Sequence, residues 1–218
     1  MALDYKLSTE NIKQRLLVAH DPNQAVIRGK FFEAEYTFFR EHIRNQRVLV
    51  AGSGLGHDSF KLAKYNQKVV GVELLEPFIT YSNEQAEYLG LDNIVFQGGD
   101  ITNLPFKNRE FHSAILNMGT IGNFDDKQMV LNELLRVASK VYFDFYPPTS
   151  SGLEKRRKMY AEELWENVRV QGTKVVSDDG LDSISLSQNE INSLVQTLGA
   201  KVKYHHFHEF SVMAEVYR

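Results

Sequence analysis

Three glycines follow a short apolar run in the segment VLVAGSGLGHDS, residues 48–59. Gly52, Gly54 and Gly56 are spaced two apart, and an apolar strand that runs into a glycine loop is typical of nucleotide sites in α/β proteins. Glycines keep side chains off the loop floor, so a ligand can lie against bare backbone. The helix expected after the loop would present free N–H groups, which favour a carboxylate. The loop alone therefore predicts a nucleotide cofactor without deciding which one.

The spacing of the glycines separates two classes of nucleotide. A dinucleotide fingerprint has its third glycine one position later, where this chain has His57. The chain also lacks the Tyr-x-x-x-Lys pair of many nicotinamide-dependent oxidoreductases. An oxidoreductase is therefore the less favoured interpretation, and a tight turn that binds nothing is a further alternative.

Acidic side chains follow the next two apolar segments. A carboxylate at Glu73 can accept hydrogen bonds from both hydroxyls of a ribose. Asp100 can accept one from an adenine amino group, and Ile101 offers an apolar edge to the ring. Each acid has a simpler explanation, a solvated strand end for Glu73 and an Asx turn for Asp100. Together with the segment NMGTIGN, residues 117–123, they fall in order at successive strand ends, which favours a ligand site.

An alternation of strands and helices must position these residues. Short apolar strands separated by helical segments imply a parallel sheet buried on both faces. We expect an α/β fold with five parallel strands, then an insertion, a helix and a terminal hairpin. The expected parallel strands are residues 48–51, 68–74, 93–98, 111–117 and 140–146.

The first 46 residues have a helical pattern. Asp21 is expected to be an N-cap, with Pro22 at the first helical position. We expect the aromatic face that follows to pack the helix on the sheet, and Tyr36 is a weaker candidate for the wall of the ligand site. The residues at helical spacing on this face are Phe31, Phe32, Tyr36, Phe39 and Ile43.

The alternation stops after residue 148. Residues 151–167 have the pattern of a charged helix, and residues 169–187 that of an antiparallel pair that turns through the sequence DDG. Ser187 and Glu190 have the spacing of a capping box, which predicts the start of another helix. The two strands expected at the end of the chain are close enough in sequence to be antiparallel neighbours.

Composition limits the class of protein. The 218 residues are 43% hydrophobic and 24% charged, with a formal net charge of −3, which is ordinary for one large α/β domain without a general attraction to nucleic acid. The absence of cysteine excludes disulfides, thiolate catalysis and thiolate metal sites. The first residues are too polar for a signal peptide, and no apolar run approaches the roughly 20 residues of a membrane span. We therefore expect a cytoplasmic protein.

Two charged clusters have competing explanations. The run KRRK, residues 155–158, could attract an anionic substrate, but a solvated helix face explains it more simply. His206 and His208 share one face of an expected strand. Half-buried strand positions explain these histidines at least as well as a metal site does, and we expect no metal.

The combination of motifs resembles the class I S-adenosylmethionine-dependent methyltransferases. The similarity covers segments from residue 47 to residue 146 in family order, and the closing segment 198–218. It implies a Rossmann-like, seven-stranded, mostly parallel doubly wound sheet with an antiparallel C-terminal strand and a lid insertion. It also implies a helical cap at 1–46 and an S-adenosylmethionine-binding domain at 47–218, within which 149–186 is a substrate-side insertion.

The resemblance assigns roles to the motif residues. The glycines would cradle the methionine part of S-adenosyl-L-methionine, and the backbone near Asn117 and Met118 would lie beside the sulfonium. Val50 departs from the family, which usually has an acid two places before the first glycine, so the ammonium must be bound by other groups. The cofactor-binding residues implied by the resemblance are Ala51, Gly52, Ser53, Gly54, Gly56, Glu73, Leu74, Asp100, Ile101, Asn117 and Met118.

The acceptor is expected to be a small molecule, with no nucleic acid or membrane partner. Enzymes that methylate nucleobase amino groups often carry Asn/Asp-Pro-Pro-Tyr/Phe after the fourth strand, whereas residues 117–120 here are Asn-Met-Gly-Thr. No catalytic base can be read from the sequence. A cofactor-binding regulatory module without transfer activity and a nicotinamide-dependent oxidoreductase are the alternatives. We expect residues 149–186 to cover the methyl end of the cofactor and to carry substrate specificity.

Overall fold

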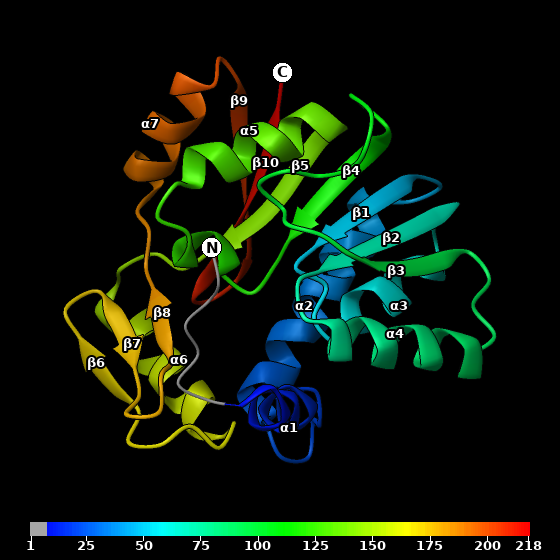
Figure 1. Cartoon of the computed structure of the whole chain (residues 1–218). Helices are drawn as coiled ribbons and strands as arrows, with labels where there is room; N and C mark the ends of the chain where they lie inside the picture. Colours follow the sequence, from blue (N-terminus) through cyan, green and yellow to red (C-terminus); the bar gives the residue numbers. More distant parts are fainter. Residues whose placement is uncertain (1–7) are drawn as a thin grey trace.

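A seven-stranded sheet forms the centre of the molecule (Figure 1). The computed structural model describes residues 8–218, and the strand order is β3-β2-β1-β4-β5-β10-β9. Strand β10 is antiparallel to both of its neighbours, while the pairs among the first five strands are parallel. The predicted sheet is thereby confirmed. The strands are β1 (Arg47–Ala51), β2 (Lys68–Glu73), β3 (Ile94–Gly98), β4 (Phe111–Leu116), β5 (Ala138–Phe145), β9 (Lys201–His208) and β10 (Ser211–Tyr217).

Helices cover both faces of this sheet because its strands are apolar on both sides. Along β1, Val48 and Val50 pack against helices α2 and α3, whereas Leu49 and Ala51 face the core that contains α5 and α7. This alternation follows from the two-residue period of a strand. The helices that pack on the sheet are α2 (Val26–His42), α3 (His57–Ala63), α4 (Glu76–Tyr88), α5 (Lys127–Val137) and α7 (Gln188–Thr197).

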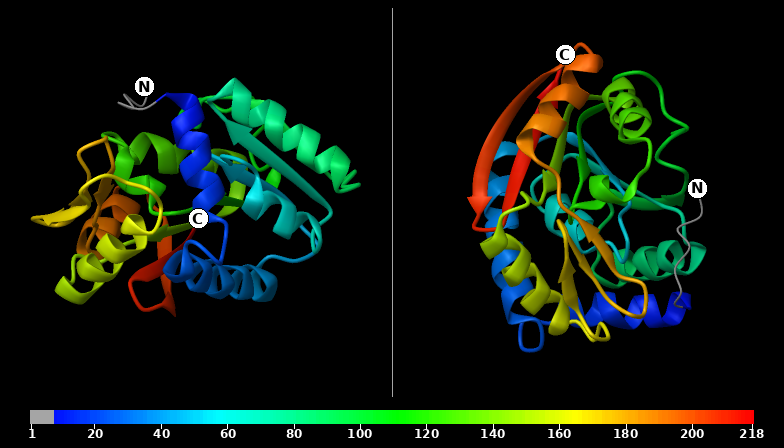
Figure 2. Two further views of the ribbon diagram at one scale, coloured as in Figure 1. Left: turned by 90° about the horizontal axis from the view of Figure 1, so that it is seen from below. Right: turned by 90° about the vertical axis from the view of Figure 1, so that its left-hand side faces the viewer.

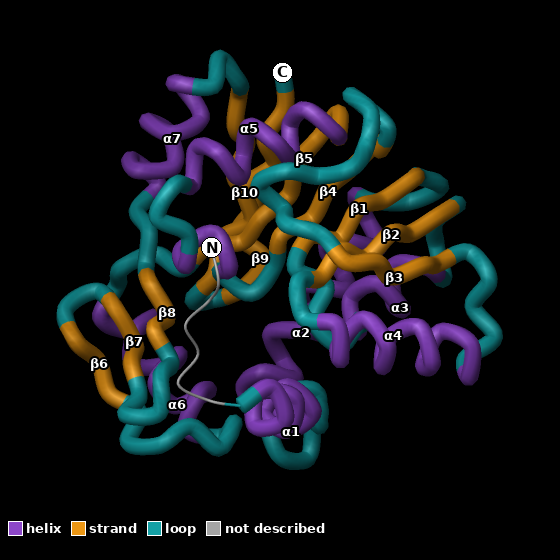
Figure 3. Tube along the Cα trace, in the orientation of Figure 1, coloured by secondary structure: helices purple, strands orange, loops and turns teal. Residues whose placement is uncertain are grey.

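The segment between β5 and α7 forms a separate small unit, visible at the lower left of Figure 3. Helix α6 (Ser150–Ala161) precedes a three-stranded antiparallel sheet of β6 (Arg169–Gln171), β7 (Lys174–Val176) and β8 (Asp182–Ile184). Two expectations were wrong here. The first expected strand breaks at Gly172, whose positive φ of 62° allows a tight hairpin. The expected helix 151–167 stops at Ala161, before Leu164 at a left-handed φ of 64°.

The helical N-terminal part contains a break that the sequence did not predict. Helix α1 (Thr9–Ala19) and helix α2 are joined by a turn, and α2 begins at Val26 rather than at Pro22. The Asp21 carboxylate accepts the Asn23 N–H at 2.9 Å and the Gln24 side-chain amide, so it closes this turn instead of capping the helix. Residues 1–7 of the predicted helical cap lie outside the described residues.

The predicted capping box is confirmed, and a second helix ends at a glycine. Ser187 and Glu190 form the reciprocal capping box at the start of α7, and Gly90 follows α4 at a left-handed φ of 65°. Between residues 8 and 218, no helix is long and apolar enough to cross a membrane.

Candidate active site

The glycine loop leaves β1 at the carboxyl edge of the sheet. Gly52, Gly54 and Gly56 have left-handed φ values of 65°, 53° and 83°, which only glycine adopts without strain. A Cβ on Gly52 would meet nothing within 4 Å, and one on Gly54 would meet only a Leu16 methyl at 4.0 Å. A Cβ on Gly56 would instead lie 2.7 Å from a ring carbon of Phe96. The first two glycines thus expose bare backbone, and the third permits the loop to pack closely on the sheet.

Glu73 ties this loop to the end of β2. One carboxylate oxygen accepts the N–H of Gly54 at 2.9 Å, and the other accepts those of Leu74 at 2.8 Å and Leu75 at 3.1 Å. These bonds occupy three of the roughly four acceptor positions of a carboxylate. A ribose with two hydroxyls would therefore have to displace at least one N–H, so the bidentate contact expected for Glu73 stays a prediction.

The loop after β3 is a turn that the Asp100 side chain closes, which is the simpler explanation for this residue. One oxygen of Asp100 accepts the Thr102 N–H at 2.8 Å and its hydroxyl at 2.7 Å, which is an Asx turn. Ile101 is buried in the main core, so only part of its edge can meet a ligand. Leu74 is exposed, Ala51 is buried at the end of β1, and Ser53 donates its N–H to the carbonyl of β2 at Val72.

The end of β4 has an unusual backbone. Met118, at a φ of 61°, and Gly119, at 65°, are both left-handed, and such strain in a non-glycine residue is often found at functional sites. A Cβ on Gly119 would lie 2.4 Å from the Tyr146 ring. The Gly119 N–H donates to Asp144 at 2.8 Å, and the Asn117 side-chain amide donates to Asp58 at 2.7 Å. The predicted residues therefore lie at the carboxyl ends of four strands, β1 to β4.

Three acids that the sequence reasoning missed lie at this edge, and we call Glu35, Asp58 and Asp144 the acid cluster. Glu35 is fully buried on α2, Asp58 is in the first turn of α3, and Asp144 is fully buried in β5. Each had a signal in the sequence. Glu35 stands within an aromatic helix face, Asp58 directly follows the glycine loop, and Asp144 interrupts the apolar segment VYFDF.

Burial dominates the electrostatics of this cluster. Loss of hydration raises the pKa of Glu35 well above its usual range, and the neighbouring charges of Asp58 and Asp144 raise it further. Burial also raises the pKa of Asp58, against hydrogen bonds from Asn117 and Tyr36. The pKa of Asp144 rises to about 6, again through burial, although the Gly119 N–H and the Ser211 hydroxyl oppose it.

Two buried arginines connect the edge to the insertion. Arg28 of α2 forms a two-pronged ion pair with Glu163, at 2.7 and 3.2 Å. Arg156 of α6 donates to the side chains of Ser183 and Ser185 and lies over the Tyr146 ring. The run at 155–158 is thus not simply a solvated face, because Arg156 is fully buried, while Lys155 and Arg157 are half-buried and only Lys158 is exposed.

Helix α1 lies across the same edge. Figure 2 (left) shows it between the insertion and α4. Ile12, Leu16 and Leu17 pack with Leu55 of the glycine loop, and Arg15 forms an ion pair with Asp179 of the insertion. The outer side of the glycine loop is therefore covered by α1.

Histidines continue this cover at the junction of α1 and α2. His20 stacks on His57, with ring centres 3.5 Å apart, and on Phe32, at 4.4 Å. Burial lowers the pKa of His20 to about 2 and that of His57 to about 4, so both rings are neutral at pH 7. The His57 ring that replaces a glycine of the dinucleotide fingerprint is thus part of a packed stack.

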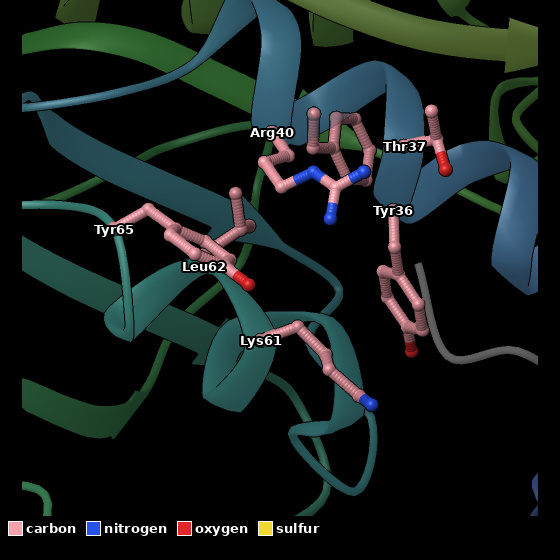
Figure 4. A pocket seen from close by; sticks show the side chains of 7 residues that line it. Tyr36, Thr37, Arg40, Lys61, Leu62 and Tyr65 are labelled. Atoms are coloured by element: carbon pink, nitrogen blue, oxygen red, sulfur yellow. The ribbon is translucent and has the colours of Figure 1, made fainter.

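A surface pocket lies between α2 and α3 (Figure 4). The Tyr36 ring lines it, and the Lys61 ammonium lies 5.0 Å from the centre of that ring. The Tyr36 hydroxyl bonds Asp58, so this residue separates the pocket from the acid cluster. The rest of the predicted aromatic face is buried: Phe31, Phe32, Phe39 and Ile43.

The histidines near the C-terminus do not form a cluster. His205 contacts Glu215 at 2.9 Å, and His206 and His208 alternate with it along β9. Within the described part of the chain, no group of three His, Cys, Asp or Glu residues could hold a metal ion.

Comparison with known proteins finds relatives of the part of the chain that carries this edge. The sequence profile of a family described as a methyltransferase domain matches residues 42–146. An uncharacterized methyltransferase of Bacillus subtilis, YcgJ, is 27% identical over 113 residues, which are 50% of this chain and 44% of that protein. A protein of Talaromyces variabilis named as an S-adenosyl-L-methionine-dependent Diels-Alderase is 28% identical over 93 residues, 42% of this chain and 32% of that protein. The matched regions thus span less than half of these curated relatives.

A solved structure matches nearly the whole chain. Magnesium protoporphyrin IX methyltransferase from Synechocystis, solved with bound S-adenosylhomocysteine, superposes with a TM-score of 0.71 and covers 99% of this chain and 97% of that one. The two sequences are 17% identical, so the likeness shows a shared fold.

Proposed function

We propose that the chain is a class I, S-adenosylmethionine-dependent methyltransferase that transfers the methyl group of this cofactor to a small molecule, and the match of residues 42–146 to a methyltransferase domain supports this. The acceptor class is supported by the net charge of −3, which offers no general field for nucleic acid. It is also supported by the contacts of α1 with the glycine loop and with the insertion, which cover part of this edge.

The glycine loop is the observation that carries the proposal. Its residues fit the methionine part of the cofactor, because the position above Gly52 is open and only a Leu16 methyl at 4.0 Å reaches the one above Gly54, while Gly56 lets the loop pack on Phe96 of β3. The Glu73 carboxylate and the Ser82 hydroxyl, which donates to the Gly54 carbonyl at 3.3 Å, fix this shape without a ligand. A loop held in its binding conformation loses little entropy when a ligand arrives.

We assign the remaining contacts by their order along the edge. Glu73 would bind the ribose, Asp100 and Ile101 the adenine, and the backbone at Asn117 and Met118 would flank the sulfonium. The cofactor supplies a methyl group that its sulfonium has already activated. The chain's own task is to align the acceptor with that methyl and to exclude water.

The insertion would supply the acceptor side. Aromatic residues of α2, α6 and the end of β5 form one cluster beside Met118, and it is closed by residues of the insertion such as Val175. We propose that the helices within residues 1–46 form a cap and that residues 149–186 form the substrate-side cover of the 47–218 domain. The aromatic members of this cluster include Phe31, Phe32, Tyr146, Tyr160 and Phe210.

A cofactor-binding protein without methyl transfer is the second candidate. The relative named as an S-adenosyl-L-methionine-dependent Diels-Alderase favours it, because that name describes a ring-forming activity with the same cofactor. Both candidates require the cofactor to bind, and they differ in whether the methyl group leaves it.

Calorimetric titration tests the proposal first. We expect S-adenosylmethionine and S-adenosylhomocysteine to bind and NAD and NADP to give no heat. Incubation with methyl-labelled cofactor and a cell extract of small molecules then separates the two candidates. Label transferred to a small molecule supports the methyltransferase, whereas binding without any transfer supports the second candidate. Binding of NADH without binding of S-adenosylhomocysteine would show that S-adenosylmethionine is not the cofactor.

A further inference from the structure

Glu35 is a buried acid without any donor to satisfy it. Its side chain is fully buried, and neither carboxylate oxygen has a hydrogen-bond partner among residues 8–218. A buried, unpaired carboxylate is costly, so such a group either stays protonated or receives a cation. Most buried polar groups in proteins are bonded, and an exception requires an explanation.

The cations near Glu35 are already engaged. Arg28 lies on the same helix and its charge acts on Glu35, but its ion pair is with Glu163, and its Nη1, which has no partner among the described residues, makes no hydrogen bond to Glu35. Lys61 lies over the Tyr36 ring and forms no ion pair with Glu35 or Asp58 within the described residues. Within the described residues no cation forms an ion pair with Glu35 or Asp58, so protons take the place that a cationic group of a ligand could fill.

Other acceptors at the same edge also lack donors. The second oxygen of Asp58 and the side-chain oxygen of Asn117 are inaccessible to water and have no partner in the described chain. The bond between Asn117 and Asp58 brings β4 next to the first turn of α3, beside the end of the glycine loop. An alkylammonium group would bring one positive charge and three N–H donors to these acceptors.

Class I methyltransferases usually have an acid two places before the first glycine, and this chain has an apolar residue there. Val50 stands two places before Gly52 and is packed in the core between the sheet, α2 and α3. Glu35 of α2 and Asp58 of α3 come from the two helices that pack on this same side of β1.

We propose that Glu35, together with Asp58 and Asn117, binds the ammonium group of the cofactor's methionine part. The inference rests on the proposed function, since it requires S-adenosylmethionine to be the ligand. An amine on the methyl acceptor would offer the same chemistry, so the experiment must distinguish the two sources.

Titration of two ligands against matched variants makes this distinction. The ligands are S-adenosylhomocysteine and its deaminated analogue, in which the ammonium is replaced by hydrogen. We expect Glu35→Gln to weaken S-adenosylhomocysteine at least tenfold and to leave the analogue within about twofold. Asp58→Asn should act in the same direction. Glu33→Gln, which changes an exposed acid on the same helix, should affect neither ligand.

Thermal unfolding without ligand checks that the variant folds. Because Glu35→Gln removes an unpaired buried acid, its Tm should equal or exceed that of the native protein. Unchanged S-adenosylhomocysteine affinity in Glu35→Gln would overturn the inference, and so would equal losses for both ligands. If the native protein binds neither ligand, the proposed function fails as well; if it binds S-adenosylhomocysteine without dependence on Glu35, only the inference fails.

Discussion

The Glu73 carboxylate accepts the N–H of Gly54 at 2.9 Å, and this bond joins the end of β2 to the glycine loop that leaves β1. The same carboxylate holds the N–H groups of Leu74 and Leu75. One side chain thus fixes both the loop and the turn into α4. A residue expected only to bind a ligand therefore also maintains the shape of the site.

Replacement of Glu73 by Ala should affect both roles. Loss of hydrogen bonds to a charged group costs about 1.5–3 kcal/mol each at most, so we expect S-adenosylhomocysteine affinity to fall tenfold or more. The free energy of unfolding should fall by about 1 kcal/mol, since Glu73 is only half-buried. Calorimetry and urea unfolding measure the two effects. Glu76→Ala, at an exposed position nearby, is the control, and native affinity in Glu73→Ala would show that the ribose lies elsewhere.

Alanine substitutions at two glycines with similar backbone conformation separate the cost of close packing in the glycine loop from the cost of backbone strain. Gly56 and Gly90 are both left-handed, but only a Cβ on Gly56 meets other atoms closely, with Phe96 at 2.7 Å and Phe60 at 2.8 Å. Gly90→Ala should cost about 1 kcal/mol through backbone strain alone. Gly56→Ala should cost about 2 kcal/mol more through overpacking. Equal losses in urea unfolding would mean that the rings move aside freely.

The raised pKa of Asp144 predicts a dependence of stability on pH. Burial raises this pKa from 3.8 to about 6, so the native state binds the proton more tightly than the unfolded chain does. The native state is therefore less stable with Asp144 ionised than with Asp144 protonated. The free energy of unfolding should fall as pH rises from about 4 through about 6. The pKa shift corresponds to a total fall of about 3 kcal/mol in the free energy of unfolding.

Asp144→Asn tests this contribution, because the amide keeps its acceptor for the Gly119 N–H and does not titrate. We expect the unfolding free energy of the variant, relative to the native protein, to increase between pH 4 and pH 7. Asp92→Asn, at an exposed position, should show no such trend. A constant difference between the Asp144 variant and native protein would contradict the raised pKa.

Hydrogen exchange can test the cover over the edge. When S-adenosylhomocysteine binds, we expect amides of α1 and of residues 149–186 to gain protection, together with α2 around Tyr36. Arg15→Ala removes the ion pair to Asp179 and should reduce the gain in both segments. Protection confined to residues 52–58, 73 and 100 would contradict the lid role and favour an interface role for the insertion.

Sequence patterns predicted the parts of the molecule that depend on local rules. The apolar strands, the glycine loop and the Ser187 capping box all have short-range signals, and each is present. Asp21 shows the limit of such rules, because Asp-Pro fits a helix start and a turn equally well. The turn is the observed conformation, stabilised by the Asn23 and Gln24 bonds.

The acid cluster could not be predicted in the same way. Glu35, Asp58 and Asp144 are far apart in sequence and meet only because α2, α3 and β5 reach one edge of the sheet. In the helical pattern, Glu35 only interrupts an apolar face. The residues around it in sequence do not indicate that two further carboxylates lie next to it in space. Such a site becomes visible only when burial and missing partners are known.

The position of α1 has a consequence for the speed of the proposed reaction cycle. Because α1 packs on Leu55 and is joined to the insertion through Arg15 and Asp179, we expect that, under the proposed function, this helix must move before spent cofactor leaves the loop. Exchange of one cofactor molecule for the next would then be slower than methyl transfer itself, as in many enzymes whose lids limit turnover. We expect a burst of one methylated product per protein molecule, followed by a steady rate that falls as solvent viscosity increases.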